Sequence, residues 1–245
     1  MRIEYVESCP STNALLAERA GADAPDGMCV VARRQTAGRG QRGNSWESLP
    51  YANLTFSLLV RPQALPAARQ FELSMVVAMS LADAVDAVLA AAGITEHCSL
   101  KWPNDLYFGD RKLAGILIEN SLSGINIARS IVGIGLNVNQ DRFFSDAPNP
   151  VSLKNITGRE HDLDALMEHV AATITAAIRQ YRAAPDSHAL LMRYKARMWR
   201  AKGTWPFREP DGEVFLSEIA EVGADGTLTL TNGRSYAFKQ IAFVL

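Results

Sequence analysis

The hydrophobic pattern of this chain changes near residues 199–203, and that change constrains the fold more than any other feature. Before it, segments with helical spacing alternate with short strand-like runs, and residues 71–92 form the longest helical segment. After it, only short alternating runs remain, separated by three hairpin-type pairs, Asp211-Gly212, Asp225-Gly226 and Asn232-Gly233. We therefore predict two domains, an α/β domain over residues 1–199 and a small β-barrel over residues 200–245.

Local patterns place the other elements along the chain. Strands are expected over residues 1–7, 28–32, 53–60, 98–101, 112–119 and 127–139, and then over 214–216, 227–230 and 238–244. Helices are expected over residues 14–20, 71–92, 163–181 and 186–199. The turn at Gly109-Asp110 predicts an antiparallel hairpin between the strand over 112–119 and the strand before it. The Pro- and Asn-rich residues 141–156 are expected to form a loop.

Composition excludes several classes of protein. The chain has 245 residues, of which 48% are hydrophobic, and a formal net charge of -1, so no global field draws it to nucleic acid or to a membrane. No apolar run is long enough to span a bilayer, and the N-terminus lacks a signal-peptide core. Cys9, Cys29 and Cys98 have neither disulfide-framework nor zinc-site spacing, so we expect buried, reduced thiols and a cytoplasmic protein.

The stretch Lys101-Trp102-Pro103-Asn104-Asp105 stands at the end of a predicted strand. Pro103 ends the strand because it has no N–H to donate, and Asn104 and Asp105 favour a turn. A lysine held there is a fixed positive charge for a carboxylate or a phosphate. The alternative is an exposed lysine at a strand end with no further role.

A glycine-rich loop follows the strand over 28–32. Gly38, Gly40 and Gly43 formally spell a dinucleotide-binding fingerprint, but no amphipathic helix opens after Gly43, so we reject that interpretation. What remains is a flexible loop with Arg39 and Arg42, able to close over a phosphate or carboxylate. The alternative is a solvated basic loop.

Three further features are candidates for ligand contact. Ser11, Thr12 and Asn13 precede the first helix, and three polar side chains exceed what one cap needs, so they are suited to a neutral polar ligand. Gly115, inside an apolar strand, predicts the close approach of a ligand or another backbone. Asn137 and Asn139 share one face by alternation; their amides either read a purine edge or satisfy each other or a turn.

Taken together, these stretches resemble the biotin protein ligases, and the resemblance covers nearly the whole chain. It rests on Ser11-Thr12-Asn13, Gln35-Thr36-Ala37-Gly38-Arg39-Gly40, Lys101-Trp102-Pro103-Asn104-Asp105, Lys112-Leu113-Ala114-Gly115-Ile116-Leu117 and Gly133-Ile134-Gly135-Leu136-Asn137-Val138-Asn139, in that order. The resemblance implies an α/β (α+β) catalytic domain like that of class II aminoacyl-tRNA synthetases, with a mixed sheet and flanking helices, followed by an SH3-like barrel. It also implies ATP-dependent activation of biotin to biotinyl-5′-AMP, with Mg²⁺, and transfer to a lysine of a biotin carboxyl carrier protein domain.

The resemblance assigns roles residue by residue. The catalytic residues implied are Lys101 and Arg39. The biotin-binding residues implied are Ser11, Thr12, Asn13, Gln35, Arg39, Gly40, Gln41, Lys101 and Gly115. The nucleotide-binding residues implied are Arg39, Arg42, Trp46, Asn104, Lys112 and Asn137, and no metal-ligating residue is expected. Gln41 and Asn44 stand where the family commonly has basic residues, so we expect retention of the adenylate to depend strongly on Arg39 and Arg42.

The sequence also bears on the binding partners and on two alternative functions. The chain reaches Ser11 almost at once, so we expect a short form without a DNA-binding helix-turn-helix and without specific DNA binding. We expect no membrane association, and a monomer or a weak homodimer pairing through an edge strand near 127–139. The rival functions are a lipoate or octanoate ligase, for which the polar set at 11–13 and Gln35 has no use, and a non-catalytic biotin sensor.

Overall fold

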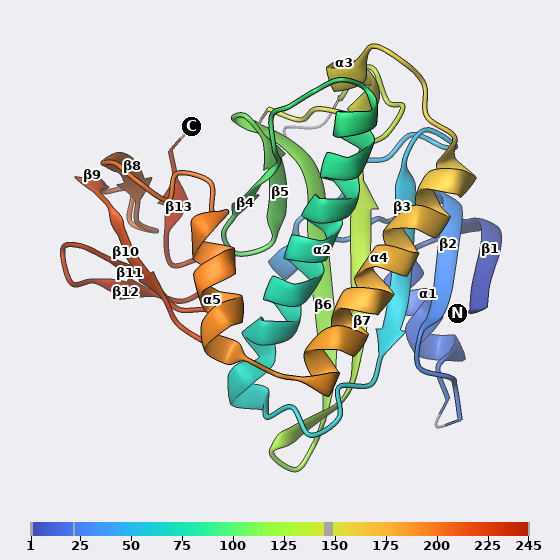
Figure 1. The fold of residues 1–245 in the computed structure, drawn as a ribbon, viewed down its shortest axis with the longest axis horizontal. Coiled ribbons are helices and arrows are strands. Elements are labelled where there is room, and N and C mark those ends of the chain that lie inside the picture. Colours follow the sequence, from blue (N-terminus) through green and yellow to red (C-terminus); the bar gives the residue numbers. More distant parts are fainter. Residues whose placement is uncertain (1, 22, 145–148, 245) are drawn as a thin grey trace.

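A seven-stranded mixed sheet is the centre of the protein (Figure 1). The computed structural model describes residues 2–21, 23–144 and 149–244, without the side chain of Arg42. The strand order is β1-β2-β3-β7-β6-β5-β4, in which only β1 and β2 are parallel. The bounds are β1 Arg2–Cys9, β2 Met28–Gln35, β3 Leu54–Val60, β4 Ser99–Lys101, β5 Asp105–Phe108, β6 Arg111–Ser123 and β7 Asn126–Leu136. The expected mixed sheet and the hairpin between β5 and β6 are confirmed.

Helices cover both faces of this sheet. One face carries α2 Gln70–Ala91, α4 Leu163–Ala183 and α5 Ser187–Ala196, which lie side by side in Figure 1. The opposite face carries α1 Thr12–Arg19, whose Leu16 packs with Val30, Leu59 and Ile131. Burial of apolar side chains against both faces is the main stabilising term, at roughly 25 cal/mol per Å² of buried apolar surface.

The core helix corrects one expectation from the sequence. Within the described ranges, the helical segment Ala67–Ala91 is long and apolar enough to cross a membrane by length and composition. The expectation that no apolar run reaches that length is therefore wrong. Of its most apolar window, 67% is buried inside the structure, where the helix packs beside α4 and α5 and against β4 and β5.

Two small sheets follow α5. Their orders are β10-β11-β12 and β13-β8-β9, and both are antiparallel. The bounds are β8 Trp205–Arg208, β9 Val214–Ser217, β10 Ile219–Val222, β11 Leu228–Leu230, β12 Ser235–Tyr236 and β13 Ala242–Phe243. The strand expected over 238–244 shrinks to β13, and β8, β10 and β12 were not expected, because such short strands are defined by their partners more than by their own pattern.

The boundary near 199–203 stays a prediction, because the two parts share one core. Phe207, Val222 and Leu228 belong to the same buried cluster as the residues under the large sheet. Trp102 Nε1 donates a hydrogen bond of 2.9 Å to the carbonyl oxygen of Gly226, which ties the turn after β4 to the small sheets.

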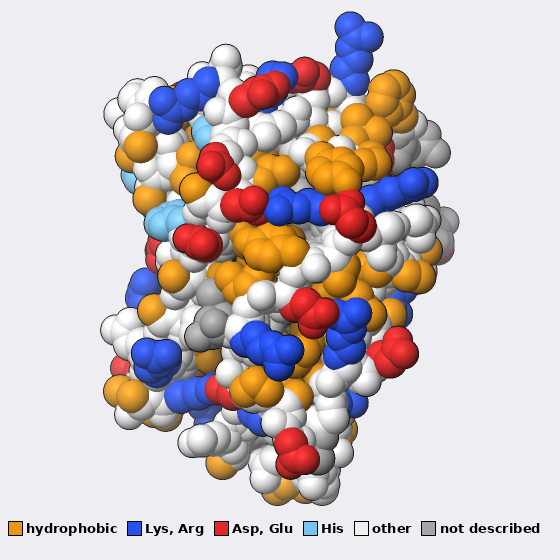
Figure 2. Space-filling model, turned by 90° about the vertical axis from the view of Figure 1, so that its right-hand side faces the viewer, with side chains coloured by type: hydrophobic (Ala, Val, Ile, Leu, Met, Phe, Trp, Pro, Cys, Tyr) orange, Lys and Arg blue, Asp and Glu red, His pale blue; other side chains and the backbone are white. Residues whose placement is uncertain are grey.

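Strand β7 lies between β3 and β6, so the expected edge strand near 127–139 is wrong, and the sheet edges are β1 and β4. Figure 2 looks from the side of β1 and shows small hydrophobic patches separated by charges of both signs. The three cysteines are free and buried, as expected. Burial raises the pKa of the Cys29 thiol to about 12.

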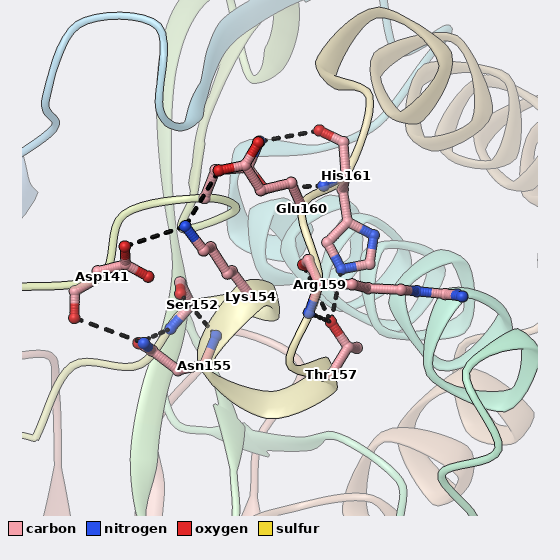
Figure 3. A network of polar contacts seen from close by, with 9 residues as sticks. Asp141, Ser152, Lys154, Asn155, Thr157, Arg159, Glu160 and His161 are labelled. Carbon is pink, nitrogen blue, oxygen red and sulfur yellow. Dashed lines mark hydrogen bonds and ion pairs between the residues drawn. The ribbon is translucent and has the colours of Figure 1, made fainter.

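The segment after β7 holds a short helix, α3 Leu153–Thr157, where a loop was expected. Ser152 and Asn155 cap it reciprocally, with two hydrogen bonds of 3.1 Å. Lys154 Nζ bridges Asp141 at 3.0 Å and Glu160 at 3.1 Å (Figure 3). Because the backbone N–H of Leu153 donates to the carbonyl of Asn137, this capped turn fixes the chain just beyond the end of β7.

Candidate functional site

A row of residues runs across the sheet on the face that carries α1. Gly135 of β7 pairs with Gly115 of β6, Gly115 with Asp105 of β5, and Asp105 with Lys101 of β4. Directly paired residues project from the same face of a sheet, so the two glycines leave that face open beside two charged side chains. The register therefore builds a shallow floor that ends at Lys101.

A polar cluster lies over the neighbouring part of this face. The Thr12 N–H donates to Gln35 Oε1 at 2.7 Å, and the Thr12 hydroxyl donates to the same atom at 3.2 Å. Ser57 Oγ lies 2.8 Å from Thr12 Oγ1 and 2.5 Å from Asn13 Oδ1. Ser11 is the N-cap residue of α1, yet its side chain makes no capping hydrogen bond. The polar residues at the start of α1 are thus committed to this cluster and not to capping.

Glycines let two side chains lie directly on the sheet. A Cβ at Gly133 would lie 2.2 Å from Asn13 Oδ1, and a Cβ at Gly135 would lie 2.3 Å from Trp46 Cε2. At Gly115 the nearest atom, Trp46 Cζ3, would be 3.1 Å away. The predicted close approach at Gly115 is therefore present, but the approaching group is an indole ring from the glycine-rich loop, not another backbone.

Arg39 reaches the polar cluster from the same loop. Its Nη2 lies 3.2 Å from Glu119 Oε2, and its Nε lies 3.5 Å from Ser11 Oγ. Asn13 Nδ2 donates to that same Glu119 oxygen at 2.7 Å. Arg39 and the cluster at the start of α1 thus meet around one half-exposed carboxylate at the end of the apolar part of β6.

The rest of the loop is only partly at the site. The N–H of Gly40 donates to the carbonyl of Asn44 at 2.6 Å, closing a tight turn around residues 41–43. Gln41 lines a small hollow with Gln70, Phe71 and Asn104, so it lies on the side of the turn after β4. The expected role of Arg42 lies outside the described side chains. The rejection of a dinucleotide fingerprint is supported, since only a three-residue 3₁₀ turn, Gln41–Gly43, occurs there.

Lys101 is a partly buried cation in an aromatic setting. Its Nζ donates to Tyr107 Oη at 3.0 Å. Burial lowers the pKa of Lys101, and the positive charges of Lys112 and Arg200 add to that effect while Asp105 opposes it. The carboxylate of Asp105 forms an ion pair of 2.7 Å with Lys112 Nζ. Lys112 therefore lies at the site, joined to Asp105, which is the neighbour of Lys101 in the row.

The two asparagines assigned to the nucleotide are largely engaged with backbone. Asn104 Nδ2 donates to the carbonyl of Ile116 at 2.7 Å, so it ties the turn after β4 to β6. Asn137 is buried, and its Nδ2 donates to the carbonyl of Val151 at 3.1 Å. Within the described part of the chain, neither Asn137 Oδ1 nor Trp46 Nε1 has a hydrogen-bond partner. Asn139 instead forms two hydrogen bonds with the backbone of His161. Of the roles considered for Asn139, the contact with a turn is therefore the one present.

Sequence reasoning missed three residues of this site: Ser57, Tyr107 and Glu119. Ser57 carried a usable signal, because it is a polar residue among Phe56 and Leu58 in a strand that proves buried throughout. Tyr107 and Glu119 carried none, since their contacts with Lys101 and Arg39 arise from strand pairing and loop closure.

The same fold occurs in solved biotin protein ligases. One from Aquifex aeolicus in complex with biotin and ATP superposes with a TM-score of 0.79 at 24% identity, covering 99% of this chain and 98% of that one. A biotin acetyl coenzyme A carboxylase synthetase from Helicobacter pylori with bound biotinylated ATP gives a TM-score of 0.60 at 26% identity, covering 96% and 98%. The chain thus belongs to the class of proteins with the biotin protein ligase fold.

Relatives in sequence agree with that class. A biotin--[acetyl-CoA-carboxylase] ligase from Mycobacterium tuberculosis is 30% identical over 95% of this chain and 84% of its own length. One from Paracoccus denitrificans is 37% identical over 67% and 69%. A bifunctional ligase/repressor BirA from Bacillus spizizenii is 32% identical over 72% of this chain, and the match spans 54% of that relative's length. The model of the biotin/lipoate A/B protein ligase family matches residues 5–137, and the chain belongs to that family.

Proposed function

We propose that this protein is an ATP-dependent biotin ligase that forms biotinyl-5′-AMP and transfers biotin to a lysine of a carrier domain of acetyl-CoA carboxylase or a related carboxylase. The observation that carries the proposal is that a neutral polar cluster and a cationic end lie on the same face of the sheet. Glycines leave that face open between them. A ligand with a neutral hydrogen-bonding head and an anionic tail fits that arrangement.

The polar cluster supports recognition of a ureido ring. The hydroxyls of Ser11, Thr12 and Ser57 and the amides of Asn13 and Gln35 offer both donors and acceptors, as a urea group requires. Ser11 to Asn13 and Ser57 are at least 95% buried, the most exposed being Ser11 at 5%. A ureido ring can exchange hydrogen bonds with these side chains, whereas an alkyl chain or a dithiolane cannot, and this difference gives selectivity against lipoate and octanoate.

The cationic end supports adenylate formation. A carboxylate oxygen of biotin attacks the α-phosphorus of ATP and pyrophosphate leaves; the amine of the acceptor lysine then attacks the acyl carbon and AMP leaves. Lys101 offsets the repulsion between the two anions and stabilises the charge that develops on phosphorus. Arg39 holds the adenylate under the loop and keeps water away from the mixed anhydride. For this, Arg39 exchanges its contact with Glu119 for the ligand.

The nucleotide end is assigned to Trp46, Asn137 and Lys112. The unpartnered Trp46 Nε1 and Asn137 Oδ1, taken among the described residues, are a donor and an acceptor suited to a purine edge. Lys112 adds a positive charge for phosphate, and Asn104 shapes the turn beside it.

Mg²⁺ would enter with the triphosphate, as a hard cation bound mainly by phosphate oxygens and water. The two carboxylates on the site face, Asp105 and Glu119, are already paired with Lys112 and Arg39. Among the described residues, the acidic group compact enough for a metal ion is Glu209, Asp211 and Glu213, between β8 and β9. The proposal further includes a cytoplasmic location and a monomeric or weakly dimeric state.

The test is ATP–pyrophosphate exchange with purified protein and Mg²⁺, run separately with biotin, lipoate, octanoate and no acid. We expect exchange with biotin alone and its loss in Lys101→Ala. Exchange with lipoate or octanoate would contradict the role of the polar cluster. Binding of biotin without any exchange would identify a sensor instead of a ligase.

A further inference from the structure

We propose that Tyr107, Trp199 and Phe243 form an aromatic cage that holds the Lys101 ammonium group ready for an anionic ligand, so that the C-terminal segment positions a catalytic side chain on the large sheet. The role of Lys101 in catalysis rests on the function proposed above. The cage itself can be tested without any turnover.

The cage is defined by three rings around one ammonium group. Lys101 Nζ lies 4.9 Å from the ring centroid of Tyr107, 5.7 Å from that of Trp199 and 5.9 Å from that of Phe243. All three distances fall within the range of cation–π attraction, about 6 Å. The hydrogen bond of 3.0 Å to Tyr107 Oη adds a directional contact. Lys101 is thus held by ring faces and one phenol.

The rings are fixed independently of Lys101. The centroids of Tyr107 and Trp199 are 5.2 Å apart, and those of Trp199 and Phe243 are 5.4 Å apart. Trp199 Nε1 donates to Asp110 Oδ1 at 2.9 Å. Phe243 packs on Phe207 of β8 at 5.0 Å. Because Trp199 and Phe243 have their own anchors and Tyr107 packs on Trp199, the cage is preformed, which limits the ordering cost when a ligand arrives.

Aromatic rings surround Lys101 where a carboxylate partner would compete with the substrate. Asp105, the residue paired with Lys101 across the strands, is bound by Lys112 at 2.7 Å. Within the described residues, no carboxylate lies within ion-pair distance of Lys101 Nζ. An incoming carboxylate or phosphate therefore has no counter-ion to displace from Lys101 in the described part of the chain. Ring faces hold a cation more weakly than a carboxylate does, so the ligand can draw the ammonium group toward itself.

Two of the three rings lie outside the hairpin of β4 and β5, which carries Lys101 and Tyr107. Trp199 follows α5, and Phe243 lies in β13, one of the small C-terminal sheets. The C-terminal segment thus contributes positioning residues to the site in addition to packing on the core.

The experiment compares three variants of the full-length protein. Phe243→Leu removes a ring of the cage, and Phe243→Tyr keeps it. Phe215→Leu removes a ring from β9 that stacks on Phe207 at 6.2 Å, and it serves as the matched control for the stability of the small sheets. The first readout is the side-chain NMR signal of Lys101 Hε and Cε in lysine-labelled protein, assigned with Lys101→Arg. The second is kcat and KM for biotin in pyrophosphate exchange.

We expect the Lys101 Hε signal to be shifted upfield by ring currents in the wild type and in Phe215→Leu and Phe243→Tyr, and to move toward the free-lysine position in Phe243→Leu. We expect kcat to fall about tenfold in Phe243→Leu, with KM for biotin changed less, and to recover in Phe243→Tyr. An unshifted Lys101 signal in the wild type, or equal losses in Phe243→Leu and Phe215→Leu, would overturn the cage. A shifted signal in a protein without exchange would overturn the ligase proposal and leave the cage intact.

Discussion

Lys112 Nζ lies 2.7 Å from Asp105 Oδ1, and the sheet register places Asp105 directly beside Lys101. Lys112, which lies beside the row, is therefore neutralised, whereas Lys101 has no carboxylate partner among the described residues. This division of roles follows from strand pairing, because Asp105 stands between Lys101 on one side and Gly115 of β6 on the other.

Asp105→Asn tests that relationship through pH. The Asp105 charge raises the pKa of Lys101 against the lowering by burial, so its removal lowers the pKa of Lys101 further. If the ammonium form is the active one, the exchange rate falls as pH rises through this pKa. We expect the alkaline limb of the pH–rate profile to move to lower pH in Asp105→Asn. Asp83→Asn, on α2, is the control, and an unmoved limb in Asp105→Asn would contradict the coupling.

Alanine at Gly133 and alanine at Gly135 are expected to impair the binding of two different substrates. Gly133→Ala places a methyl group 2.2 Å from Asn13 Oδ1, so we expect KM for biotin to rise. Gly135→Ala places it 2.3 Å from Trp46, so we expect KM for ATP to rise. Displacement of a packed side chain costs about 1–3 kcal/mol, or roughly 5- to 150-fold in KM. Gly21→Ala, with no atom within 4 Å, should be neutral, and identical defects in both floor variants would disprove the division.

Ser57→Ala tests the residue that the sequence did not reveal. Its hydroxyl joins Thr12 and Asn13, so removal loosens the cluster without adding bulk. We expect KM for biotin to rise about tenfold with little change in kcat, as for loss of one buried hydrogen bond. Isothermal titration with biotin alone checks the same effect. Ser80→Ala, whose hydroxyl bonds only within α2 in the described structure, is the control and should bind biotin normally.

Arg39→Ala tests retention of the adenylate. Among the described cations of the glycine-rich loop, the Arg39 guanidinium lies nearest the polar cluster. Its loss should therefore speed the release of biotinyl-5′-AMP by about tenfold or more. The release rate is measured by rapid dilution of preformed complex. Arg42→Ala tests the sequence-based expectation that Arg42 shares this task, and an unchanged release rate in that variant would refute it.

Glu72→Gln tests a buried charge remote from the row. Burial favours the neutral acid, but hydrogen bonds from Arg69 at 2.7 Å and Tyr181 at 2.5 Å outweigh it and hold the pKa of Glu72 below its ordinary value. Its contribution to stability is therefore present above the ordinary glutamate pKa and lost as pH falls through the lowered one. We expect a loss of about 2–3 kcal/mol in urea unfolding at pH 7, shrinking under acid. Glu96→Gln, an exposed carboxylate, should change little at either pH.

Local patterns predicted much of the fold because their causes are local. Helical spacing gave α2 and α4, and Asp162 caps α4 as expected, accepting from the backbone N–H groups of Asp164 and Ala165. Alternation gave β2, β3, β6 and β7 to within a few residues. The polar residues at 11–13, the arginine loop and Lys101 were all identified by residue type and neighbours. By contrast, the two-residue strands β12 and β13 depend on tertiary contacts, and α3 is too short to show a helical period, although its capping residues Ser152 and Asn155 are local.

By itself, the sequence determined the family, the main helices and strands, and the chemical kinds of side chain available to a site. Only the tertiary structure decided how they meet. It placed Gly135, Gly115, Asp105 and Lys101 in one row, laid Trp46 on the glycines, paired Asp105 with Lys112 and brought Phe243 to Lys101. The physical reason is that strand register and ring packing join residues far apart in the chain, where a shift of one position turns a side chain to the other face.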